Sequence, residues 1–194
     1  MSPAISELYN FAFRGVLAEV ALDRQGRKSK LLLKMADEDI AKAIALESLD
    51  SVHVANAKAM AVVYTAIAAF ESGVRDLVTK VLKDKYAENW WDKGFPNSVR
   101  DRAMKRIVDE QNARWHSQRG QDPINYTTFT DLKNAMNNNW LDFEDIVGSL
   151  TWAAGIFEVV ERSRNVIMHS GTLEREDIDR LGVNIRDWVK QVGA

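Results

Sequence analysis

Residues 51–86 read SVHVANAKAMAVVYTAIAAFESGVRDLVTKVLKDKY, and this stretch decides the fold class. Its apolar residues recur three and four positions apart, which is the period of a helix that buries one face. We therefore predict one long helix over these residues. Its broad apolar face is formed by Val63, Ile67, Phe70, Val74, Leu77, Val78 and Val81.

The rest of the chain has the same helical period. Only 3 prolines and 10 glycines interrupt the 194 residues, and no segment carries a clear strand pattern. The sequence therefore predicts an all-α fold, a helical bundle of six to seven helices. The other predicted helices span residues 6–23, 28–49, 97–115, 130–139, 144–170 and 174–192.

Two segments interrupt this pattern. Residues 89–96, NWWDKGFP, break the helix, and the adjacent Trp90 and Trp91 cannot share one helix face, so at least one should cover the end of the core. Residues 116–125 contain a glycine, a proline and several polar residues, which indicates a loop. In domain terms, we expect an N-terminal helical extension over 1–50 and the main helical domain over 51–194.

Composition narrows the possible functions. The formal net charge is −2, so nucleic-acid binding would need a local basic patch rather than a global positive field. The chain has no cysteine, which excludes disulfides and thiolate metal sites, and no other residues show metal-ligand spacing, so we expect neither metal nor cofactor. No stretch of about 18 uncharged apolar residues is present, and we expect a cytoplasmic protein without a membrane span.

The residues best suited to chemistry lie in 161–171, ERSRNVIMHSG, near the end of a predicted helix. This segment holds Arg164, Asn165 and His169, the only histidine of the C-terminal third. Imidazole titrates nearest to neutral pH and a guanidinium is a natural partner of phosphate. The combination therefore indicates phosphodiester chemistry.

Helix geometry limits how these side chains can act together. At about 100° per residue, Asn165 and His169 lie one turn apart on the same face, whereas Arg164 and His169 are rotated by about 140°. Arg164 and His169 cannot meet on one helix, so the site needs a second surface that closes over it. The amide of Asn165 would orient the imidazole or hold a phosphate oxygen, and Gly171 is predicted to cap the helix.

A second pair lies on the long helix. Glu71 and Arg75 are four residues apart in the acid-first order that favours an ion pair. The pair is either an ordinary helix ion pair or a half-buried carboxylate held against Arg164 or His169 from a neighbouring helix. We name Glu71 and Arg75 as supporting site residues.

The motif residues also have plain structural interpretations. His169 would then be a capping or packing histidine, and Arg164 would form a surface ion pair with Glu161. His53 and His116 are expected to be surface residues.

The predicted helix over 97–115 carries several basic residues, among them Arg102 and Arg106, and ends at Trp115. Arginine and aromatic side chains can contact phosphates and stack on single-stranded bases, which makes Arg102 and Arg106 candidate RNA-binding residues. Acidic residues are interleaved with them, so a solvated helix face is the alternative.

The order of these features resembles the HEPN superfamily, the higher eukaryotes and prokaryotes nucleotide-binding helical domains, many of which are metal-independent ribonucleases. Its signature is an arginine, a polar residue and then a histidine near the end of a core helix, and the RNxxxH pattern of Arg164, Asn165 and His169 matches it. The resemblance covers about residues 51–193 and looks like the branch found in a eukaryotic RNA-surveillance endonuclease. It extends through residues 70–75, Trp90–Trp91, 126–132 and 140–144.

This resemblance implies a four-helix HEPN-like core and a homodimer in which two motif helices face each other. It implies an endoribonuclease of toxin or anti-phage type that cuts single-stranded or looped RNA, with no metal and with a cognate antitoxin or regulatory protein as a further partner. A non-catalytic HEPN module that binds a nucleotide, RNA or protein is one alternative. A helical scaffold in which the motif is accidental is the other.

Overall fold

The structure is a computed structural model that describes residues 37–193, and its contacts divide the chain into two units, 1–51 and 52–194. The predicted helix over 6–23 lies outside the described residues. In the first unit, α2 spans Asp37–Ala43 and a 3-10 turn spans Leu46–Ser48. The prediction of a helix to residue 49 is therefore wrong at its end, because Ala45 adopts a left-handed backbone conformation with φ 52°.

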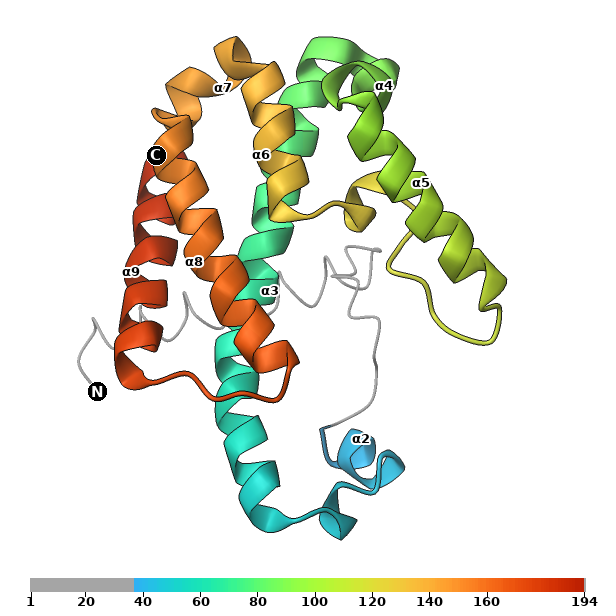
Figure 1. Cartoon of the computed structure of the whole chain (residues 1–194), viewed down its shortest axis with the longest axis vertical. Coiled ribbons are helices and arrows are strands. Elements are labelled where there is room, and N and C mark those ends of the chain that lie inside the picture. Colours follow the sequence, from blue (N-terminus) through green and yellow to red (C-terminus); the bar gives the residue numbers. More distant parts are fainter. Residues whose placement is uncertain (1–36, 194) are drawn as a thin grey trace, which may run out of the picture. The chain divides into compact units, whose positions relative to one another are not determined.

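The remaining described residues are also helical, and no strand occurs between residues 37 and 193, so the all-α prediction is confirmed (Figure 1). The helix over 51–86 is confirmed at both ends. Short 3-10 turns span Ala87–Asn89 and Pro123–Tyr126. The helices are α3 (Ser51–Tyr86), α4 (Trp90–Gly94), α5 (Asn97–Asn112), α6 (Phe129–Asn138), α7 (Trp140–Val147), α8 (Leu150–Met168) and α9 (Arg175–Val192).

The hydrophobic core draws residues from α3, α6, α8 and α9, with further residues from α5 and α7. Four residues of the predicted apolar face of α3 are buried and the other three pack partly buried against the core. An aromatic cluster at the centre brings Phe70, Phe129, Phe157 and Trp188 together, with ring centroids 5.2 to 6.3 Å apart. Because this cluster draws one ring from each of α3, α6, α8 and α9, it fixes α8 against α3 and α6.

Two predicted details differ at the ends of this core. The helix predicted over 144–170 is two helices, because Gly148 has φ 73° and the Ser149 side chain then caps α8 by accepting from the Trp152 N–H. The prediction that at least one tryptophan covers the core is confirmed. Both Trp90 and Trp91 pack partly buried against it.

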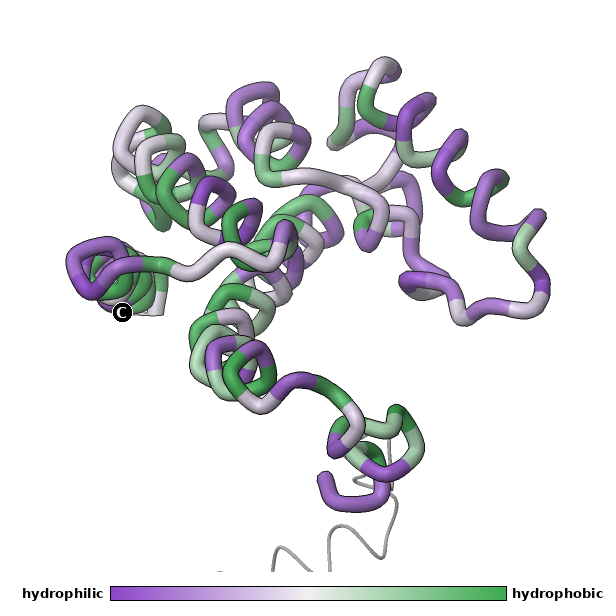
Figure 2. The backbone as a smooth tube through the Cα atoms, turned by 60° about the horizontal axis from the view of Figure 1, so that its bottom comes forward, coloured by the Kyte–Doolittle hydropathy of each residue, from purple (hydrophilic) through white to green (hydrophobic). Residues whose placement is uncertain are grey.

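The first half of α3 is apolar but exposed. Up to Ala66 it buries only Met60, whose sulfur accepts from the Leu173 N–H in the α8–α9 connection. By length and composition the segment Ser51–Gly94 could cross a membrane, and only 11% of its apolar window is buried. Figure 2 shows apolar residues along this part of α3. The second half of the helix supplies the bundle core, which accounts for the apolar residues there.

Candidate functional site

The end of α8 positions the histidine of the motif. His169 is the C-cap residue, and Ser170 follows in the left-handed region with φ 62°. The Ser170 N–H donates to the Ile167 carbonyl at 3.0 Å and the Gly171 N–H to the Val166 carbonyl at 2.8 Å. These two bonds form a Schellman motif, which fixes the backbone on both sides of the imidazole.

The predicted capping role of Gly171 is therefore wrong, because the C-cap is His169 and the left-handed residue is Ser170. Gly171 is needed for a different reason. A Cβ atom at this position would lie 2.7 Å from the Val166 side chain and 2.9 Å from its carbonyl oxygen. The glycine lets the chain pass close to α8 and turn towards Leu173.

Asn165 and His169 are both exposed at this end of α8. Neither side chain makes a hydrogen bond or ion pair within residues 37–193. Their donors and acceptors are therefore available to a ligand or to another subunit. Of the two alternative interpretations of His169, capping agrees with its C-cap position, whereas packing has no support because the residue is exposed.

Arg164 lies on the side of α8 that faces α3. Its Nε atom is 3.6 Å from Oε2 of Glu71, while Oε1 of Glu71 accepts from Arg75 at 2.5 Å. Arg75 also donates to the Thr127 carbonyl at 3.1 Å. The structure thus brings Arg164, Glu71 and Arg75 together, and the alternative ion pair of Arg164 with Glu161 is not formed.

This cluster has an uneven charge balance. The Glu71 side chain is only 15% exposed and serves two guanidinium groups, so one positive charge remains uncompensated. The Nε atoms of Arg75 and Arg164 are buried without a hydrogen-bond partner within the described part of the chain. The Arg164 side chain is 38% exposed, so the excess positive charge is open to a phosphate even though its Nε atom is buried.

The structure does not bring Arg164 and His169 together within one chain. Arg164 is turned towards α3, whereas His169 lies exposed beyond the last turn of α8. This agrees with the rotation expected from their spacing. A site that uses both residues on one phosphate needs a second surface.

Arg102 and Arg106 have structural partners. Arg102 pairs with Oδ1 of Asp131 at 2.5 Å, and Arg106 lies 3.7 Å from Oδ2 and donates to the Tyr126 carbonyl. Asp131 is 3% exposed and closes a capping box with Thr128 at the start of α6. Both arginines therefore tie α5 to α6, and their contact with RNA stays a prediction.

Sequence reasoning missed Asp131, although a signal was present. Thr128 and Asp131 have the spacing of a capping box directly before an apolar run, which marks a helix start. Two arginines four residues apart on α5 could then have been assigned to that buried carboxylate. Within residues 37–193, no group of three or more histidine, aspartate or glutamate side chains could hold a metal ion.

Replacing Glu71 with glutamine should lower any turnover at this site about tenfold, because Arg164 loses the charge that holds it in place. The amide oxygen can still accept from Arg75, so the fold should change little. Measuring kcat, KM and Tm separates the two roles: positioning lowers kcat, whereas a purely structural role lowers only Tm. Glu110→Gln is the control, because Glu110 also accepts from an arginine, Arg119, away from the site.

A family model described as Swt1-like HEPN matches residues 65–193. The matched region contains Glu71, Arg75 and the three motif residues of α8. No curated protein and no solved structure matches the chain.

Proposed function

Because the chain belongs to the Swt1-like HEPN family, we propose that it is a metal-independent endoribonuclease that cuts single-stranded or looped RNA. The observation that carries this proposal is the arrangement at the end of α8. Arg164 is held by Glu71 with a spare positive charge, while Asn165 and His169 stand unpaired and exposed on the same helix. These are the groups that phosphodiester cleavage at a 2′-hydroxyl requires.

In the proposed reaction, His169 takes the proton of the 2′-hydroxyl, and the 2′-oxygen attacks the adjacent phosphorus. The bond from phosphorus to the 5′-oxygen breaks, and this oxygen takes a proton from the second imidazole of a dimer. The products are a 2′,3′-cyclic phosphate and a 5′-hydroxyl. Arg164 stabilises the charge that builds up on the phosphoryl oxygens, and Asn165 orients the imidazole or the phosphate.

We propose that a second copy of the chain completes the site. Two motif helices related by a two-fold axis would place one subunit's Arg164 near the other's His169, which a single chain cannot do. Apolar side chains on the last turn of α8 support this, since Val166 is 39% and Met168 55% exposed. Such residues beside unpaired polar groups are typical of the centre of an interface.

Met168→Glu should convert a dimer into a monomer, because a buried carboxylate without a partner strongly opposes association. Light scattering at micromolar concentration measures this directly. The matched control is Met104→Glu on α5, where the methionine is 58% exposed, and this variant should stay dimeric. A wild-type protein that is monomeric under these conditions would contradict the composite site.

The biological setting of the proposal is a toxin or anti-phage nuclease in the cytoplasm. A free ribonuclease damages its own cell, so such a protein is held by a cognate antitoxin or a regulatory protein. A chain with a net charge of −2 attracts RNA only weakly in general. We therefore propose that the enzyme acts on a specific RNA or on RNA brought to it by a partner.

The direct test incubates purified protein with end-labelled RNA in the presence of a metal chelator. We expect cleavage with 2′,3′-cyclic phosphate ends by the wild type and none above background by Arg164→Ala. Equal cleavage by both proteins would exclude the proposed site. RNA binding without cleavage would instead assign the chain to the non-catalytic members of the family.

A further inference from the structure

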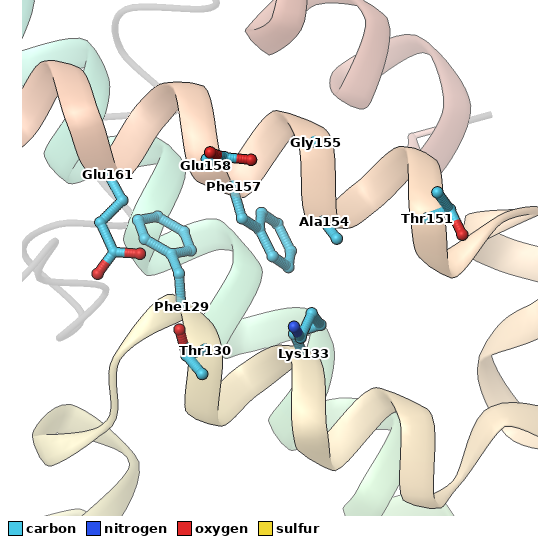
Figure 3. Close-up of a pocket in the computed structure, with 9 residues that line it drawn as sticks. All are labelled: Phe129, Thr130, Lys133, Thr151, Ala154, Gly155, Phe157, Glu158 and Glu161. Carbon is cyan, nitrogen blue, oxygen red and sulfur yellow. The ribbon is translucent and has the colours of Figure 1, made fainter.

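A groove of about 500 Å³ lies between α6 and α8, outside the residues of the proposed active site. The rings of Phe129 and Phe157 form its floor, with centroids 5.2 Å apart and a tilt of 30°. Polar side chains stand along both sides, as Figure 3 shows. They are Thr130 and Lys133 from α6 and Thr151, Glu158 and Glu161 from α8.

Two charged side chains of this groove are unpaired within the described residues. Lys133 and Glu161 are both half-buried, yet neither makes an ion pair or a hydrogen bond there. Glu158 differs, because it accepts from Arg162 at 2.6 Å. Half-buried charges without partners are usually satisfied by a ligand or by water. The groove thus offers a free cation and a free carboxylate above an aromatic floor.

The end of the groove at Glu161 lies on the same helix as the proposed active site. Glu161, Asn165 and His169 follow each other at four-residue intervals on α8, so they lie along one face of the helix. The distance from Glu161 to His169 along the axis is about 12 Å. A short single strand with its scissile phosphate at His169 would place a neighbouring nucleotide in the groove.

We propose that this groove binds a guanine base of the RNA next to the cleavage point, with the Glu161 carboxylate as its specificity-determining contact. This inference rests on the proposed ribonuclease function and names the base that the site selects. Single-stranded RNA is commonly read by hydrogen bonds to the Watson–Crick edges of unstacked bases. The groove is concave, partly apolar and lined by a few polar groups, as ligand sites are.

Guanine fits the available groups better than the other bases. A carboxylate accepts two parallel hydrogen bonds, and guanine alone offers two adjacent donors, N1–H and N2–H, on its Watson–Crick edge. The guanine O6 atom lies beside these donors and can accept a hydrogen bond from an ammonium group such as that of Lys133. Adenine and cytosine present one amino group next to an unprotonated ring nitrogen, which a carboxylate repels.

A substitution of Gly155, which lines the groove, can test whether a ligand binds there. Gly155 lies in the middle of α8, and a Cβ atom there would meet nothing within 4 Å. Because Gly155 lines the groove and has room for a Cβ atom, we expect a larger side chain at this position to occupy part of the groove. Gly73 on α3 is the matched control, because a Cβ atom there also meets nothing within 4 Å.

The experiment has a binding arm and a cleavage arm. In a His169→Ala background, which removes turnover, the four ribonucleoside monophosphates are titrated and their dissociation constants measured by calorimetry. We expect the guanine nucleotide to bind most tightly. Glu161→Gln should reduce the preference for guanine about tenfold or more, whereas Glu110→Gln, outside the groove, should keep it. Gly155→Met should block all four nucleotides, and Gly73→Met none.

In the cleavage arm, the protein with His169 intact cuts oligonucleotides that differ in one base beside the cleavage point. The inference is supported if the wild type cleaves fastest beside guanine and Glu161→Gln cleaves at the same rate beside every base. Cleavage with the same base preference in wild type and Glu161→Gln overturns it and leaves the ribonuclease standing. No cleavage, combined with Glu161-dependent guanine binding, overturns the ribonuclease and leaves the groove as a nucleotide site.

Discussion

His169→Ala should reduce RNA cleavage about 100- to 10,000-fold, the range that a positioned acid or base contributes. In a dimer both imidazoles are lost at once, so we expect the upper part of this range. The substitution should leave the fold intact, because His169 is exposed and its side chain has no partner within residues 37–193. Initial rates on end-labelled RNA and the Tm of each protein measure the two effects.

The matched control for this prediction is His116→Ala. His116 is also exposed, and within residues 37–193 its ring contacts Trp115 and the Ser117 carbonyl. This variant should cleave RNA at the wild-type rate. Added imidazole should restore part of the activity of His169→Ala. Comparable losses in both histidine variants would contradict a specific role of His169.

Asp131→Asn should lower the free energy of unfolding by about 2–3 kcal/mol, because two arginines lose the buried charge that they share. The exposed sides of Arg102 and Arg106 remain hydrated, which keeps the loss below that of a fully buried pair. Urea denaturation at neutral pH measures the change. Asp142→Asn is the control, since Asp142 pairs with Lys85 at the surface. This variant should lower the free energy of unfolding much less.

The effect of Asp131 should also depend on pH. Burial opposes ionisation of this carboxyl, but the hydrogen bonds from the Thr128 N–H and the Arg102 guanidinium outweigh it and hold its pKa below the usual value. The unfolded pKa is about 3.9. The stabilisation is therefore complete above about pH 4 and is lost as the pH falls through the lower folded pKa.

The difference in the free energy of unfolding between wild type and Asp131→Asn should accordingly become smaller in strong acid. Denaturation curves at neutral pH and at successively lower acidic pH values test this. A difference that stays constant over the acidic range would show that the Asp131 charge does not stabilise the fold.

The helices of the core could be predicted from the sequence because each carries its own periodic signal. The helix over 51–86 was predicted at both ends, since its apolar face repeats without interruption. The tryptophans expected to break the helix instead form the short α4, and the chain turns before them at Ala87, which has φ 48°. The break between α7 and α8 was missed. One glycine with a left-handed backbone ended α7 there, and a single glycine inside a helical pattern is weak evidence for a break.

The candidate site, like the fold, was only partly predictable from the sequence. The candidate motif of Arg164, Asn165 and His169 could be named from spacing and from the family resemblance. The partner of Arg164 was left open between two carboxylates, Glu161 on the same helix and Glu71, which is 93 residues away along the chain. Only the packing of α8 against α3 decided between these two carboxylates.

By itself, therefore, the sequence determined the helices, the family and the motif, because periodicity and spacing are local properties that a single helix expresses. The tertiary structure decided which charges meet: Arg164 with Glu71, Arg102 and Arg106 with Asp131, and neither Lys133 nor Glu161 with any described residue. Such pairings depend on how helices distant in sequence pack their buried faces. Burial then decides which charges are satisfied within the chain and which stay free for a ligand.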